Sequence, residues 1–224
     1  MIKENAKRIL EDIYETAIKA GRKPEDITLV GVTKTVTAKE AKELMDAGVS
    51  TLGENRVQSL LDKYETLGDS PIWHLIGHLQ TNKVKYIADK VTMIHSVESL
   101  KLAEEIDRQF GKHQRKAEVL LQVNISGEES KFGVTPEEAF LLAEQMANFK
   151  NLTVCGLMTM APLSATPLQT RKIFAGLQKL SVDIGAKKYD NINMRHLSMG
   201  MSGDYREAIC EGATLVRIGS ALFA

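Results

Sequence analysis

Short apolar runs alternate with longer amphipathic segments along almost the whole chain. Eight runs are rich in β-branched residues, as buried strands are, and they read ITLVGVT, TLGEN, WHLIG, VTMIHSV, EVLLQVNIS, TVCGLMTM, MRHLSMG and TLVRIGS. The segments between them have helical periodicity, for example AKEAKELMDAG, NKVKYIADK, SLKLAEEIDRQF, TPEEAFLLAEQMANF and TRKIFAGLQKLSVDIG. This alternation predicts parallel strands joined by crossover helices.

The number of these units points to one particular α/β architecture. Eight strand–helix units close a (β/α)8 TIM barrel, so we predict a single barrel domain over residues 1–224. A doubly wound open sheet is the alternative, but no GxGxxG motif follows the first strand. The first twenty residues place Ile9, Ile13 and Ile18, with Leu10 and Ala17, on a helical stripe. We therefore expect an extra N-terminal helix and place it across the bottom of the barrel.

Composition restricts the partners and the compartment. The 224 residues include 29 Lys and Arg and 29 Asp and Glu, so the formal net charge is zero. A protein that binds nucleic acid or an anionic membrane usually has a basic excess. No apolar run reaches the roughly 18 residues of a membrane span, and the charged N-terminus does not resemble a signal peptide. We expect a cytoplasmic monomer in which Cys155 and Cys210 are reduced.

Candidate chemistry lies where the predicted strands end, because barrels of this kind carry their sites there. Lys34 ends the first run, and desolvation at such a place lowers the pKa of an amine and favours its nucleophilic form. The loops SMGMSGD and IGS follow the last two runs and offer hydroxyls and backbone amides. Such groups suit a phosphate dianion, although ordinary turns have the same composition.

Arg217 lies inside the apolar run TLVRIGS and needs an acceptor if it is buried. The acceptor is either a carboxylate, with Glu54 the clearest candidate, or an atom of a ligand. Pyridoxal phosphate (PLP) needs a lysine for its aldehyde, a cradle for its phosphate and a partner for its ring nitrogen. Lys34, the two loops and Arg217 match these needs, and a Schiff-base aldolase without a cofactor is the rival interpretation.

The stretch HLIGH places His74 and His78 four residues apart, a spacing that also occurs in zinc sites. We predict no metal here, because the stretch is strand-like, Gly77 interrupts it and the glutamate of an HExxH motif is missing.

Motifs over residues 31–223 resemble those of the pyridoxal phosphate homeostasis protein family, and they are GVTKT, LGENRVQ, WHLIGHLQTNK, VNISGEESKFG, GLMTMAP, LSMGMS and VRIGSALF. The barrels of that family are similar to the barrel domain of bacterial alanine racemase. The resemblance implies that Lys34 holds PLP as an internal aldimine, that Asn55 lies near the ring and that Arg217 faces the pyridine nitrogen. It implies that backbone amides and hydroxyls of four residues hold the phosphate, namely Ser198, Met199, Gly219 and Ser220. The family usually has threonine where Ser220 stands, so a hydroxyl is kept.

The resemblance also bears on activity. Arginine only donates hydrogen bonds, so a ring nitrogen that faces Arg217 stays unprotonated and is a weaker electron sink. Alanine racemase takes a tyrosine acid/base from a second domain, and with the sequence ending at Ala224 we expect no such domain. Tyr205 is expected in the first turn of a short helix. We therefore expect a carrier for PLP (vitamin B6) homeostasis with no catalytic residues and with apo-enzymes as recipients, and a weak PLP-dependent amino-acid racemase is the alternative.

Overall fold

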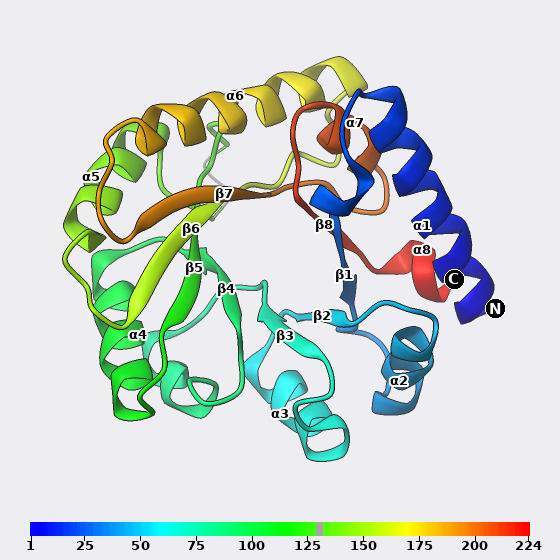
Figure 1. The fold of residues 1–224 in the computed structure, drawn as a ribbon, viewed down its shortest axis with the longest axis horizontal. Coiled ribbons are helices and arrows are strands. Elements are labelled where there is room, and N and C mark those ends of the chain that lie inside the picture. The colour runs from blue at the N-terminus through cyan, green and yellow to red at the C-terminus, as the bar shows by residue number, and fades with distance from the viewer. Residues whose placement is uncertain (129–131) are drawn as a thin grey trace.

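A computed structural model describes residues 1–128 and 132–224, and its eight strands form a closed barrel in chain order (Figure 1). Each strand is parallel to both neighbours, and β8 pairs with β1 through Leu29↔Val216 and Val30↔Arg217. This closure confirms the predicted (β/α)8 barrel and is incompatible with an open sheet. The strands are β1 (Thr28–Val32), β2 (Thr51–Glu54), β3 (Ile72–Leu75), β4 (Met93–Val97), β5 (Ala117–Gln122), β6 (Leu152–Met158), β7 (Ile192–Ser198) and β8 (Leu215–Ile218).

Helices surround the barrel. Those between strands are α2 (Ala38–Asp46), α3 (Val57–Leu67), α4 (Leu100–Lys112), α5 (Pro136–Met146), α6 (Pro167–Gly185) and α7 (Tyr205–Cys210). Helices α2, α5 and α6 begin with capping boxes, in which a threonine and the Glu or Gln three residues later satisfy each other's backbone amides. These local signals explain why the crossover segments start where they do. Among the described residues, no helix is long and apolar enough to cross a membrane.

The segment NKVKYIADK, predicted as a helix, forms a short 3₁₀ helix, η2 (Thr81–Tyr86). Backbone bonds run from Lys83 N to Gln80 O and from Ile87 N to Val84 O, each spanning three residues. Val84 and Ile87 are both fully buried and lie three apart, which is the period of a 3₁₀ helix. The tighter winding therefore places both apolar side chains on the barrel.

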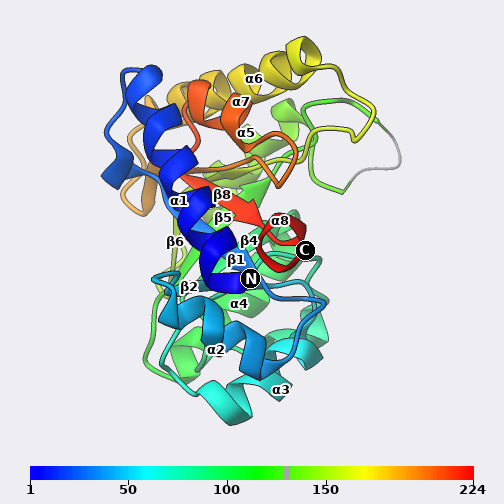
Figure 2. The same cartoon turned by 90° about the vertical axis from the view of Figure 1, so that its right-hand side faces the viewer.

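The N-terminal helix α1 (Ile2–Lys19) forms as predicted, but its expected position was wrong. It packs against α2, α7 and α8 (Ser220–Phe223) and runs along the side of the barrel beside β8 and β1, not across its bottom (Figures 1 and 2). The reason is that α8 is a single turn, too short to cover the outer faces of the two strands. The covering face uses Ala6, Ile9, Ile13 and Ala17, whereas Ile18 is 54% exposed.

Apolar side chains fill the protein in two places. The larger core lies between the strands and the surrounding helices. A smaller one fills the barrel interior and consists of Val30, Met93, Leu120, Cys155, Met158 and Leu215. Inside such a barrel there is no open channel, so ligands are confined to the mouth formed by the loops that follow the strands.

Candidate functional site

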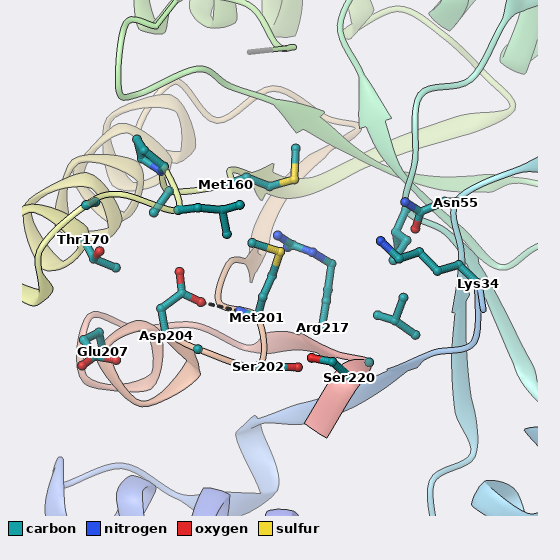
Figure 3. A pocket seen from close by; sticks show the side chains of 18 of the residues that line it. Lys34, Asn55, Met160, Thr170, Met201, Ser202, Asp204, Glu207, Arg217 and Ser220 are labelled. Atoms are coloured by element: carbon teal, nitrogen blue, oxygen red, sulfur yellow. Dashed lines mark hydrogen bonds between the residues drawn. The ribbon is translucent and has the colours of Figure 1, made fainter. Parts of the chain in front are cut away.

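A cavity of about 490 Å³ lies at the carboxyl end of the strands (Figure 3). Of the predicted site residues, five line it, namely Lys34, Asn55, Arg217, Gly219 and Ser220. They come from the ends of β1, β2 and β8, which lie far apart in the sequence and are brought together by barrel closure. The loops after β6 and β7 supply the opposite wall.

Lys34 follows β1 by two residues. Side chains alternate along the strand, so Val30 and Val32 face the interior while Thr33 points outward and bonds to Glu54. The same alternation turns Lys34 into the mouth, where it extends toward the cavity on the side of Asn55 (Figure 3). Its amine forms no ion pair with any described residue. It is therefore available to a ligand in the cavity.

Arg217 is the most deeply buried cation of the cavity, with 4% of its surface exposed. Its Nη1 donates to Ser198 Oγ at 2.6 Å and its Nη2 donates to the Thr159 carbonyl at 3.0 Å. Burial lowers the pKa of Arg217 to about 10, so the guanidinium remains charged near neutral pH. A guanidinium has five N–H donors, so these two bonds leave donors for the cavity.

Of the two kinds of acceptor considered for Arg217, the carboxylate of Glu54 is not its partner. Glu54 is fully buried but points outward, where its Oε1 lies 2.9 Å from Lys63 Nζ and accepts from Thr33 Oγ1 at 2.6 Å. The two partners of Arg217 are neutral oxygens instead. Within the described residues, no carboxylate forms an ion pair with this guanidinium.

A chain of buried hydrogen bonds continues from Arg217 into the barrel. Ser198 Oγ lies 2.8 Å from His95 Nδ1, and His95 Nε2 lies 3.0 Å from His74 Nδ1. Burial lowers the pKa of His74 to about 3 and that of His95 well below its ordinary value, so both rings are neutral. Because arginine can only donate, Ser198 accepts from it, and the His95 ring links Ser198 to His74. Sequence analysis did not find this chain, since its members come from four different strands.

The loop after β7 offers different residues to the cavity from those predicted. Ser198 and Met199 are fully buried and do not line it, and the Met199 amide donates to the Leu215 carbonyl at 3.2 Å. The physical reason is that β7 extends through Ser198 and the next amide still bonds to β8. The lining begins two residues later, with Met201, and continues through Ser202 and Gly203 to Asp204.

Two features fix the fold of this loop. Gly200 has a φ of +92°, which L side chains rarely adopt, and a Cβ there would meet the Tyr205 and Ala208 side of α7. Asp204 Oδ1 accepts from the Met201 amide at 2.6 Å. Burial raises the pKa of the Asp204 carboxyl group, which lines the cavity opposite Lys34 (Figure 3). The loop is thus fixed against α7, and Ser202 and Gly203 lie at the mouth of the barrel.

The two histidines of HLIGH do not share a site. His74 points into the barrel toward His95, whereas the Nδ1 atom of His78 lies 2.9 Å from the Glu98 carboxylate. In the described part of the chain, no three His, Cys, Asp or Glu side chains lie close enough to hold a metal ion.

Comparison with known proteins finds both a matching family model and similar proteins of known name. The family model for the N-terminal domain of alanine racemase matches residues 17–224. A pyridoxal phosphate homeostasis protein of Aquifex aeolicus is 44% identical over 221 residues, which cover 98% of this chain and 96% of that protein. One from Pseudomonas aeruginosa is 41% identical, over 99% of this chain and 94% of its own.

Solved structures of other proteins share the barrel fold. PipY of Synechococcus elongatus PCC7942 with PLP bound has a TM-score of 0.88 and 31% identity, and the match covers 100% of both chains. An alanine racemase of Clostridium difficile has a TM-score of 0.78 at 18% identity and shares the fold over 98% of this chain and 56% of its own. The resemblance found in the sequence motifs is confirmed, and the chain belongs to the pyridoxal phosphate homeostasis protein family.

Proposed function

We propose that this protein binds PLP at the mouth of the barrel and serves the homeostasis of that cofactor. The names of its relatives and the PLP in a related PipY structure support the proposal. The main observation behind it is the buried guanidinium of Arg217. Two neutral oxygens accept from this group, and its remaining N–H donors lie beside a cavity that Lys34 also lines. A pyridine nitrogen is an acceptor that suits such a donor.

The lining residues divide into three roles. The Lys34 amine would form a Schiff base with the aldehyde, releasing water, and Asn55 would lie near the ring. Arg217 would donate to the ring nitrogen. Hydroxyls and backbone amides of the two glycine-containing loops would bind the phosphate, and the geometry favours Ser202, Gly203, Gly219 and Ser220. Ser198 then acts behind Arg217, and no direct role remains for Met199.

We propose further that the protein holds PLP without efficient turnover of amino acids. When bound, PLP supplies an electron-withdrawing ring, and a nitrogen that accepts from Arg217 stays unprotonated and withdraws less. Proton transfer at the face opposite Lys34 needs an acid or base within hydrogen-bond reach. Among the described residues that line the cavity there is no tyrosine or histidine, and the titratable acids there are the carboxyl groups of Asp204, which accepts from the Met201 amide, and of Glu207 on α7. Tyr205, at the start of α7, bonds through its hydroxyl to Asp12 on α1 instead.

The test is absorbance spectroscopy of the PLP-loaded protein before and after borohydride reduction, followed by peptide mass mapping. We expect a reducible yellow species and a single modified peptide that contains Lys34. Lys34→Ala should abolish it while keeping the circular dichroism spectrum, because a side chain at a strand end contributes little packing. A reducible adduct at another defined lysine, or no adduct in the parent protein, would overturn the assignment.

Turnover is measured separately, by incubating the loaded protein with alanine or serine in deuterated water. If the protein is a carrier, α-deuterium incorporation should be slow or absent, and PLP should pass from the loaded protein to an apo-enzyme. We propose that both proteins are in the cytoplasm. Incorporation at the rate of an ordinary metabolic enzyme, lost in Lys34→Ala, would establish a racemase instead.

A further inference from the structure

A second cavity of about 480 Å³ lies beside the first, and Asn55 lines both. Its walls come from the segment between β2 and α3, from the start of α3, from the segment after β3 and from η2. None of the other residues that line it borders the first cavity. It is therefore a separate recess next to the proposed PLP site, and its chemistry can be considered independently.

The polar lining of the second cavity is cationic. Arg56 and Lys83 both line it, and neither forms an ion pair or a side-chain hydrogen bond with a described residue. No carboxylate is among the described residues that line it. The nearest acid along α3, Asp62, accepts from Gln58 Nε2 at 2.8 Å and is thereby engaged on the helix surface. Two positive charges thus face one recess with no described counter-charge inside it.

Other lining groups add an amide, from Gln80, and a flat apolar surface. His78 lies at the edge of the cavity, where its Nδ1 donates to the Glu98 carboxylate at 2.9 Å. Tyr86 contributes an aromatic ring, with Lys83 Nζ 5.6 Å from its centroid, and Leu61 contributes an apolar side chain. Helix α3 begins at Val57, and its N-cap residue Arg56 makes no side-chain cap, so the amides of the first turn add to the positive potential of a recess that the cations already define.

We propose that this second cavity binds the phosphate group of a phosphate monoester. A monoester carries about −1.5 to −2 charges at pH 7, which matches the two cations. The guanidinium of Arg56 can bind two phosphate oxygens at once, and the ammonium of Lys83 acts as a compact third contact. The ring of Tyr86 and the side chain of Leu61 then cover the organic part of the ligand. Through Asn55, an occupant of this cavity adjoins the proposed PLP site.

The experiment titrates inorganic phosphate and phenyl phosphate into the full-length protein and follows backbone amides by ¹⁵N NMR and affinity by calorimetry. Phenyl phosphate has no aldehyde, so it cannot react with Lys34. We expect saturable shifts in residues 56–59 and 80–83. Affinity for both probes should fall at least tenfold in Arg56→Gln and in Lys83→Gln, and phenyl phosphate should bind more tightly than phosphate.

The matched control is Lys85→Gln. Lys85 lies on η2, two residues from Lys83, and its amine is 4.9 Å from the same Tyr86 ring, but it does not line the cavity. This variant should bind both probes like the parent protein. Absence of saturable binding, equal losses in all three variants, or shifts confined to the loops after β7 and β8 would overturn the proposal. The last result would place phosphate in the first cavity only, and none of these outcomes depends on whether Lys34 holds PLP.

Discussion

Removing the amine of Lys63 should destabilise the barrel strongly, because Lys63 neutralises a carboxylate that has no route to water. Glu54 is fully buried and Lys63 is 7% exposed, and their charged atoms lie 2.9 Å apart between β2 and α3. Thr33 Oγ1 donates to the same Oε1 atom, while Oε2 has no partner in the described structure. In Lys63→Met the carboxylate therefore retains a single described donor.

The expected loss of stability can be expressed as a fall in the melting temperature. Breaking a buried pair by removing one partner costs about 3–5 kcal/mol. In a protein of this length each kcal/mol lowers the melting temperature by about 2–4 °C, so we expect a fall of about 6–20 °C by circular dichroism. Because Thr33 precedes Lys34 and Asn55 follows Glu54, the variant should also retain PLP less well.

Two controls separate this reasoning from general damage to α3. The double variant Glu54→Gln/Lys63→Met removes both charges and should recover at least half of the lost stability. Lys19→Met breaks the exposed pair of Lys19 and Glu15, whose side chains are 77% and 66% exposed, and should cost at most about 1 kcal/mol. A melting temperature of Lys63→Met no lower than that of Lys19→Met would refute the argument.

Three more predictions concern the barrel interior. Ser198→Ala should leave the fold intact but remove one of the two hydrogen bonds of Arg217. The absorbance of bound PLP should shift and its retention should weaken roughly tenfold, which corresponds to the loss of a hydrogen bond to a charged group. Ser198→Thr should restore both the absorbance and the retention, and an unchanged spectrum in the alanine variant would contradict this. His74 and His95 stay neutral in the fold but protonate near pH 6.5 when unfolded, so the unfolded state binds more protons below that pH. As the pH falls below about 6.5, the free energy of unfolding in urea should fall by about 1.4 kcal/mol per pH unit for each histidine, and the slope should be shallower in His95→Gln. Equal stability at pH 7 and pH 5 would count against it. Gly156→Ala should give little soluble protein, because the new Cβ would clash with a carbonyl oxygen of β7. A normal yield with a melting temperature like that of the parent protein would contradict this and show that the strands shift easily.

The architecture was predictable because its signals are local. Each strand is a short apolar run and each crossover helix has its own period, so the barrel and the place of Lys34 at its mouth followed from the sequence. The position of α1 did not, because an amphipathic stripe indicates that a face is buried but not what covers it. Ile18 was assigned to the wrong face because its spacing from Ile13 was five residues, whereas the buried positions Ile9, Ile13 and Ala17 recur every four.

The loop after β7 shows a second limit. Part of the motif SMGMSGD lines the cavity at the mouth, but which of its residues do so depends on where β7 stops pairing with β8. That register is a tertiary property, and it leaves Ser198 and Met199 buried, so that the lining of the cavity starts at Met201. The sequence left two acceptors open for Arg217 for the same reason. The orientation of side chains at the end of β2, which turns Glu54 away from the barrel interior, is also a tertiary property.

Because β8 pairs with β1, the sheet has no edge strand. Unpaired strand edges present rows of free amides and carbonyls on which other chains add, and proteins normally protect them with charges, prolines or bulges. A carrier of the proposed kind would spend part of its time without its ligand. Its ligand-free form would expose the loops and side chains of the mouth, while the eight described strands stay closed into one barrel. We therefore expect the two forms to resist aggregation equally, so that release does not have to be coupled to immediate refilling.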